Sequence, residues 1–203
     1  MIRVYFLLLT ISSALALSGC ASMSAEECHT ADWRTIGFED GAQGRTADSI
    51  RRHRKACAKA GVTADQAAYE NGRQSGLRSF CQPGRGYDLG RNGGRYQGVC
   101  PADLEATFLQ AYEEGRYLYD LEQAVREVEN QIQATDRDLA TRRDDLAAGE
   151  RELIDGVGDR STRSALVDNN RELAQTIAQL ELEREQLLIE LGVRRAALAD
   201  YAQ

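Results

Sequence analysis

The sequence lacks the features by which many enzymes and nucleic-acid-binding proteins are identified. It contains no G-x-S-x-G or H-E-x-x-H motif and no lone cysteine with a plausible histidine partner. With 25 basic and 32 acidic residues its overall charge is acidic, which argues against a nucleic-acid partner because phosphate backbones require a basic surface. We therefore expect no catalytic residues, no cofactor and no nucleic-acid partner. A glycosidase-like carboxylate pair stays as the enzymatic alternative, although most carboxylates fall on solvated helix faces.

The apolar run at the N-terminus is too short to cross a membrane. It covers Val4–Leu17, about 14 residues, whereas a spanning helix needs roughly 20. Arg3 precedes the run and Leu17-Ser18-Gly19-Cys20 ends it, which resembles the lipobox of bacterial lipoproteins. We expect residues 1–19 to be a signal peptide that is removed, and Cys20 to carry the lipid. An ordinary signal peptide with an incidental cysteine is the alternative.

Lipidation at Cys20 would make the membrane a partner of the chain. Two or more acyl chains hold a protein stably at a bilayer, whereas one holds it only marginally. Ala21 follows the cysteine. In Gram-negative lipoproteins Asp at that place favours the inner membrane, so the resemblance implies an outer-membrane lipoprotein that faces the periplasm.

Composition divides the rest of the chain into two parts. Residues 21–116 contain 13 basic and 13 acidic side chains, whereas residues 117–203 contain 11 basic and 19 acidic ones. Both prolines, the only tryptophan and most glycines lie in the first part. We expect a mainly α protein with a small, Gly-rich, disulfide-stapled head at residues 20–116 and an acidic helical arm at residues 117–203.

Four cysteines follow the anchor position: Cys28, Cys57, Cys81 and Cys100. An even number in an oxidising compartment predicts two disulfides. Three connectivities are possible, and we favour Cys28–Cys57 with Cys81–Cys100 because short loops close at lower entropic cost. A metal site, using His29 or His53, is the alternative. Because no C-x-x-C or H-x-x-x-H spacing occurs, we expect none.

The head contains a repeat of the form aromatic–acidic–any–Gly. It begins at Phe38, Tyr69, Tyr87 and Tyr112, and in the last three copies Arg73, Arg91 or Arg116 follows the glycine. Glycine in a helix costs up to about 1 kcal/mol relative to alanine, so its repeated use predicts close packing of short helices. Gly37 and Gly41, or Gly72 and Gly76, have the required spacing. The alternative is a groove for an anionic or glycan ligand, lined by Tyr69, Arg73, Tyr87, Arg91, Tyr112 and Arg116.

Helix boundaries in the head can be predicted from its capping residues. Thr63-Ala64-Asp65-Gln66 has the form of a capping box and predicts a helix over 64–80. Pro101 suits the first turn of a helix that starts at about 102. Between them, residues 82–99 contain Pro83 and six glycines, which is typical of a loop.

These positions together resemble an uncharacterised lipoprotein family, domain of unknown function 2799. The resemblance covers about residues 20–119. It depends on an ordered series: Cys28, Trp33, Gly37, Asp40-Gly41, Cys57, Asp65, Tyr69, Gly72-Arg73, Gly76, Cys81, Gly86, Gly90, Tyr96 and Cys100-Pro101. It implies a lipoprotein and supplies no catalytic residues.

Leucines recur every seven residues in the arm. One series is Leu118, Val125, Ile132, Leu139, Leu146 and Leu153, and a second is Leu166, Leu173, Leu180 and Leu187. These heptads predict helices over about 117–154 and 162–201. The break at 156–159 holds two glycines, so we expect an antiparallel coiled-coil hairpin. Asn170 and Arg184 interrupt the apolar seam, and a polar seam residue often sets register or partner number.

These observations predict a structural or protein-interaction lipoprotein without enzymatic activity. Two long helices leave apolar flanks, so self-association or a partner protein could complete the coiled coil. A self-sufficient hairpin is the simpler alternative. The second functional interpretation is a lipoprotein that binds an envelope ligand or glycan through the Arg- and Tyr-containing head.

Overall fold

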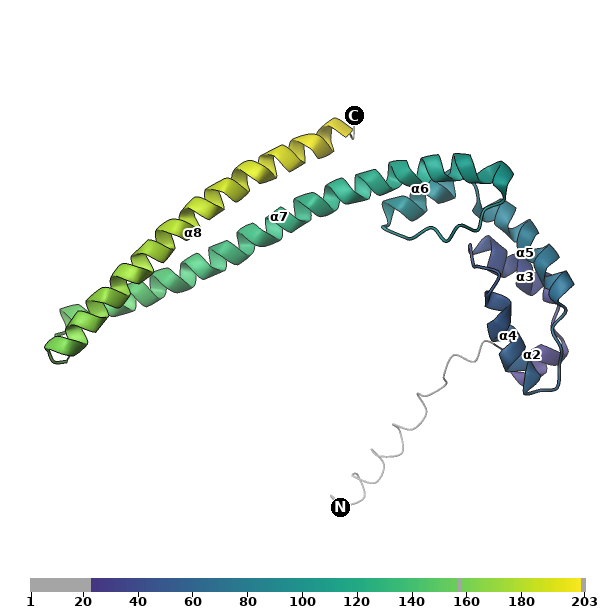
Figure 1. Cartoon of the computed structure of the whole chain (residues 1–203), viewed down its shortest axis with the longest axis horizontal. Helices are drawn as coiled ribbons and strands as arrows, with labels where there is room; N and C mark the ends of the chain where they lie inside the picture. The colour runs from purple at the N-terminus through teal and green to yellow at the C-terminus, as the bar shows by residue number, and fades with distance from the viewer. Residues whose placement is uncertain (1–22, 157, 202–203) are drawn as a thin grey trace, which may run out of the picture. The chain divides into compact units, whose positions relative to one another are not determined.

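The computed structural model describes residues 23–156 and 158–201. The expected leader at residues 1–19 and Cys20 lie outside the described residues. The described chain is mainly α, as predicted, and contains no strand (Figure 1). Its helices are α2 (Ala25–His29), α3 (Trp33–Ala42), α4 (Ser49–Ala58), α5 (Gln66–Phe80), α6 (Pro83–Arg91), α7 (Ala102–Ile154) and α8 (Arg160–Tyr201). They form two compact units: unit 1 extends to Leu89 and includes Gly94–Glu113, and unit 2 comprises Gly90–Gly93 and the chain from Glu114 onward.

Side-chain caps fix where the head helices start. The Asp32 carboxylate accepts hydrogen bonds from the backbone N–H groups of Arg34 and Thr35 at the start of α3. The Asp65 carboxylate accepts one from the Ala68 N–H at the start of α5. Asp65 is therefore the cap, and the predicted capping box at Thr63 is wrong by two residues, since a carboxylate at position 65 can reach the free N–H groups itself.

The glycine-rich segment at residues 82–99 was expected to be a loop, but its first half forms α6. Pro83 occupies the first position of this helix, where no N–H donor is needed. Gly86 lies so close to α7 that a Cβ atom there would be 2.4 Å from the Phe108 carbonyl oxygen. Only the later glycines serve as turn residues: Gly93 and Gly98 have φ values of 71° and 65°.

Helices α3 and α5 are in backbone contact through glycines, as the repeat predicts. A Cβ atom on Gly37 or Gly41 would lie 2.0 or 2.2 Å from a carbonyl oxygen of α5. A Cβ atom on Gly72 or Gly76 would lie 1.9 or 2.1 Å from a carbonyl oxygen of α3. Along both helices the contacts advance in the same direction, so α3 and α5 pack parallel.

Two disulfides tie the helix pairs of unit 1, in the connectivity favoured from the sequence. Cys28–Cys57 joins α2 to the end of α4, with Cα atoms 5.4 Å apart. Cys81–Cys100 joins the chain before α6 to the chain before α7, with Cα atoms 5.6 Å apart. Each disulfide belongs to a buried apolar cluster, one around Trp33 and Tyr69 and the other around Leu77 and Phe108. In each half of unit 1, a disulfide is therefore part of a buried apolar core.

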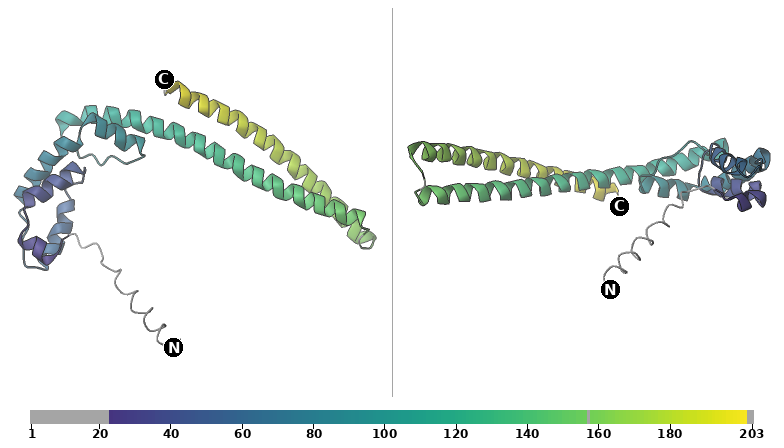
Figure 2. Two further views of the ribbon diagram at one scale, coloured as in Figure 1. Left: turned by 180° about the vertical axis from the view of Figure 1, so that it is seen from behind. Right: turned by 90° about the horizontal axis from the view of Figure 1, so that it is seen from below.

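In unit 2, α7 and α8 form an antiparallel pair (Figure 2). Ion pairs join Arg143 to Glu181, Asp136 to Arg184 and Glu129 to Arg195, so the residue numbers fall on α7 as they rise on α8. The apolar cluster between the helices contains seam residues from both heptads: Val125, Val128, Ile132, Leu187, Leu191 and Leu198. The hairpin predicted from the heptads is thus present in unit 2.

Helix α7 is longer than the predicted first arm helix. It runs without interruption for 53 residues from Ala102 to Ile154. The helix expected from about 102 and the helix expected from about 117 are one element. The boundary between the units falls within it, after Glu113.

Candidate functional site

The two repeat residues of α5 are buried. Tyr69 is 1% exposed, and its hydroxyl donates a 2.7 Å hydrogen bond to Asp40 Oδ2. Burial, together with that hydrogen bond, raises the pKa of Tyr69 above its usual value. Arg73 is 7% exposed and donates to both carboxylate oxygens of Glu70, which holds the pKa of Glu70 below its usual value. Neither Tyr69 nor Arg73 can line an open groove.

Asp40 is the centre of a buried polar network in unit 1. Its side chain is 5% exposed and pairs with Arg45 Nη1 at 3.0 Å, while His53 Nε2 lies 3.0 Å from its second carboxylate oxygen. With the Tyr69 hydroxyl, these groups compensate a carboxylate that would otherwise be costly to bury. The network joins α3, α4 and α5. Sequence analysis missed it because the partners are 5, 13 and 29 residues away.

Tyr112, Arg91 and Arg116 are also engaged by the protein, whereas Tyr87 is partly exposed. In unit 1, the Tyr112 hydroxyl donates to the Gly94 carbonyl at 3.1 Å, and Tyr87 is 36% exposed. In unit 2, Arg91 forms a two-pronged ion pair with Glu122, and Arg116 bonds to Asp120. These contacts favour the packing interpretation of the repeat and give no support to a ligand groove.

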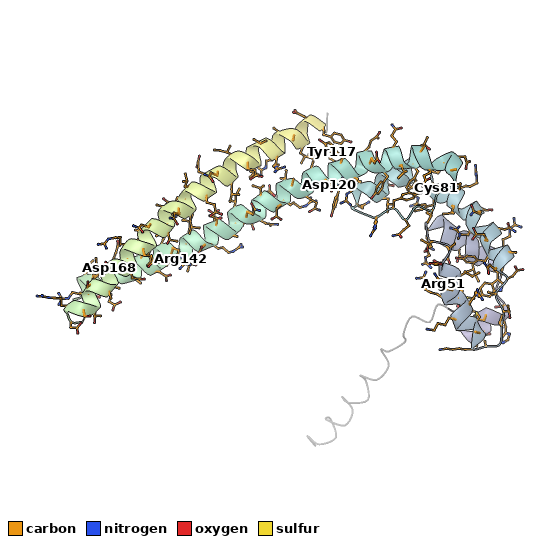
Figure 3. All side chains as sticks on the ribbon, in the orientation of Figure 1. Arg51, Cys81, Tyr117, Asp120, Arg142 and Asp168 are labelled. Atoms are coloured by element: carbon orange, nitrogen blue, oxygen red, sulfur yellow. A yellow bond between two sulfur atoms is a disulfide. The ribbon has the colours of Figure 1, made fainter. Side chains whose placement is uncertain are left out.

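Polar residues interrupt the hairpin seam in two different ways. Arg184 donates from Nε to Asp136 at 2.6 Å, so its charge is paired across the hairpin. Asn170 is 8% exposed, and neither polar atom of its amide has a partner within the described part of the chain. Gly149 faces it, and a Cβ atom there would lie 2.2 Å from Asn170 Oδ1. A side chain at position 149 would therefore require the Asn170 amide to shift. Figure 3 shows the side chains along both helices, with Arg142 and Asp168 labelled.

A second apolar surface lies on α8, away from the seam. Leu182, Ile189 and Val193 are 63%, 64% and 65% exposed. At roughly 100° per residue they share one helix face, whose centre is about 140° from the seam residue Leu187. Gly192 and Ala196 lie on the same face and are also exposed; a Cβ atom on Gly192 would meet nothing within 4 Å. We call these five residues the α8 outer face.

The α8 outer face differs from the other outward positions of the hairpin. The corresponding positions of α7 are polar and exposed: Asn130, Arg137, Asp144 and Arg151. The first half of α8 has Asp168 and Gln175 there. Clustered exposed apolar residues are typical of interaction sites. The heptad pattern of the seam does not reveal this face, because these apolar residues lie outside its register.

The described residues show neither a metal cluster nor a membrane-spanning segment. Between residues 23 and 201, Val157 excepted, no group of three or more His, Cys, Asp or Glu side chains is placed to hold a metal ion. None of the helices described is long and apolar enough to cross a bilayer.

Comparison with known proteins finds one similarity. Residues 32–117 match the model of a family described as "protein of unknown function (DUF2799)". No curated protein and no solved structure matches the chain. The matched segment contains the glycine-packed pair α3 and α5, both cysteines of the second disulfide and all four repeats. Residues 32–117, less than half of the chain, are therefore similar to this family of unknown function.

Proposed function

We propose that this protein is a non-catalytic lipoprotein of the outer membrane, facing the periplasm, whose hairpin binds a second copy of the same chain through the α8 outer face. The observation that carries the proposal is the exposure of Leu182, Ile189 and Val193 on one side of α8. In an isolated hairpin these side chains stabilise nothing. Full burial of an aliphatic side chain is favourable by about 1.5–3 kcal/mol. Because about two-thirds of each of these side chains is exposed, its burial against a partner would contribute roughly two-thirds of that free energy.

The charges beside this face favour a second copy as the partner. Glu181, Glu183 and Glu185 lie near its start, and Arg194 and Arg195 lie near its end. Within the hairpin Arg194 is paired with Glu190, Arg195 with Glu129 and Glu181 with Arg143, at exposed positions where an ion pair is weak. In an antiparallel pairing centred on Ile189, the acidic end of one α8 meets the basic end of the other. Glu183 and Glu185 make no ion pair within the described residues, so their charge is available to a partner. A parallel pairing would place like charges together.

Small residues on the same face permit a close approach. Gly192 weakens an isolated helix by about 1 kcal/mol relative to alanine. Nothing in the hairpin occupies the space beside it. In unit 1 the same chain uses glycines to bring α3 and α5 into backbone contact. Gly192 and Ala196 can serve a second α8 in the same way.

Anchoring through Cys20 would assist this association. Three partly exposed side chains per copy give a weak interface, because association itself costs about 4–15 kcal/mol of lost rigid-body freedom. Tethering both copies to one membrane raises their effective concentration and lowers that cost. The proposal therefore predicts weak dimers of the unacylated chain in solution and stable dimers at the membrane.

Sedimentation equilibrium of the chain from Ala21 onward tests the proposal. We expect the wild-type chain to dimerise at high concentration and Ile189→Asp to be monomeric. Gln175→Asp is the matched control, since it adds the same charge at an outward position of α8. Helical circular dichroism should be the same in all three, because Ile189 lies outside the seam. A monomeric wild type, or dimers that survive Ile189→Asp, would contradict the proposal.

Mass spectrometry of the protein purified from membranes tests the anchor separately. The proposal requires an N-terminal Cys20 that carries acyl chains. An intact leader, or a mature chain that begins elsewhere, contradicts the anchoring and leaves the α8 interface untouched.

A further inference from the structure

Helix α4 concentrates positive charge in an acidic protein. The chain has a net charge of −7, yet α4 carries Arg51, Arg52, Arg54 and Lys55 and no carboxylate, and Lys59 follows its last residue. All five side chains are exposed, whereas Ile50, His53 and Cys57 form the buried side of the helix. The basic residues therefore occupy the solvent-facing side of α4, where Figure 3 labels Arg51.

Much of this charge is not compensated by the protein. Arg51 pairs with Asp48 at 2.5 Å, but both side chains are at least 70% exposed, so the pair is weak. Within the described residues, Arg54, Lys55 and Lys59 form no ion pair. This contrasts with the repeat arginines Arg73 and Arg91, whose charges are neutralised by Glu70 and Glu122.

The same cations border an open cleft. Arg51, Arg54 and Lys55 line it together with Ala58 and residues 61–64, and its volume is about 630 Å³. No carboxylate lines the cleft. An anionic group therefore meets three cations there, of which Arg54 and Lys55 form no ion pair and Arg51 is paired only with the exposed Asp48. The cleft is wide and open, which suits groups presented on a surface better than a small enclosed ligand.

A disulfide holds α4 close to the N-terminal end of the chain. Cys57 lies near the end of α4 and is bonded to Cys28. Only eight peptide steps separate Cys28 from Cys20, and a fully extended chain of that length reaches at most about 28 Å. If Cys20 is the lipid anchor of the proposed function, Cys28 lies within that reach of the membrane, and α4 is attached to it through Cys57, with Cα atoms 5.4 Å apart.

We propose that the basic side of α4, formed by Arg51, Arg54, Lys55 and Lys59, binds the phosphate groups of an anionic lipid surface. The inference rests on the anchoring in the proposed function for its location, and on the charges and the cleft of α4 for its chemistry. The acyl chains hold the protein at the bilayer, and α4 adds a second, electrostatic attachment that orients unit 1. Each basic residue near an anionic surface strengthens binding by about fivefold, and salt screens the effect within about 10 Å at 0.1 M.

Vesicle flotation with the chain from Ala21 onward tests this site without the lipid anchor. This chain keeps every residue that the structure describes. The probes are phosphatidylcholine vesicles with and without phosphatidylglycerol, at low and high salt. We expect binding only to the vesicles with phosphatidylglycerol, and its loss at high salt.

The test variant replaces Arg51, Arg54 and Lys55 by Gln. Its binding to phosphatidylglycerol vesicles should fall about a hundredfold. The matched control replaces Arg160, Arg163 and Arg171 of α8 by Gln, which changes the net charge equally at exposed positions and should leave binding unchanged.

Three outcomes overturn the proposal: no binding by the wild type, equal losses in both variants, or full competition by millimolar inorganic phosphate, which would indicate a site for the free ion. Acylation of Cys20 is measured independently by mass spectrometry. Vesicle binding through α4 with an unacylated Cys20 would therefore refute the anchor alone.

Discussion

Gly72→Ala is the sharpest test of the packing in unit 1. A Cβ atom at position 72 would lie 1.9 Å from the Arg34 carbonyl oxygen, a distance that real Cβ contacts do not reach. The obstacle is backbone, so no rotamer change can relieve it, and α3 and α5 must move apart by about 1 Å or more. Three further glycines make equally close contacts along the same pair of helices, so that movement would loosen all of them.

The expected loss follows from two opposing terms. Overpacking of a close interface costs about 1–3 kcal/mol and sometimes more, whereas alanine in place of glycine favours the helix by about 1 kcal/mol. Because the clash involves a carbonyl oxygen that cannot yield, we expect a net destabilisation of about 2 kcal/mol. For a unit of this size that lowers the melting temperature by roughly 10 °C.

Fluorescence of Trp33 is the appropriate assay, because it is the only tryptophan and lies in the core of unit 1. Far-ultraviolet circular dichroism would instead be dominated by the hairpin. Gly84→Ala is the control: it lies in α6, and its added Cβ atom would meet nothing within 4 Å. We expect this variant to melt at or above the wild-type temperature. Equal melting temperatures for Gly72→Ala and Gly84→Ala would refute the close-packing argument.

Three further predictions concern stability. Reduction of the disulfides should destabilise unit 1 by about 3–4 kcal/mol per bond and leave the hairpin's circular dichroism transition in place; an unchanged Trp33 transition would contradict this. Folding raises the pKa of Tyr69. The protonated Tyr69 hydroxyl therefore contributes fully to the free energy of unfolding below the ordinary pKa of 10.0, and this contribution is lost as the pH rises above that value. Tyr69→Phe should reduce that alkaline loss, and urea titrations that show the same loss in both proteins would oppose it. Asn170→Leu should stabilise the hairpin by about 1–2 kcal/mol, since it removes a buried amide without partners; a lower melting temperature would contradict the assigned seam.

The sequence predicted the parts of the fold that depend on local patterns. The heptads beginning at Leu118 and Leu166, with a short glycine-containing break between them, were sufficient to predict the two helices and their antiparallel pairing. Loop length was sufficient to favour the correct disulfide connectivity. The hairpin and the disulfide pairing could both be predicted because the contacts involved depend on the spacing of residues along the chain.

The errors arose where a residue type has two uses. The glycines of residues 82–99 predict a loop, but Gly86 serves the contact between α6 and α7. Contacts across unit 1, such as those of Asp40 with His53 and Tyr69, leave no periodic signal in the sequence. The α8 outer face does leave one, since Leu182 and Ile189 are seven residues apart, but it is masked by the stronger heptad of the seam.

The central claim is that the α8 outer face joins two copies of this chain. Its most direct test is in-cell photo-crosslinking from a benzophenone side chain placed at residue 189, compared with the same group at residue 144 on the polar outer side of α7. The account predicts an adduct of twice the chain's mass from position 189, with both halves identified by mass spectrometry as this protein, and none from position 144. An adduct with a different protein, or equal adducts from both positions, would contradict it.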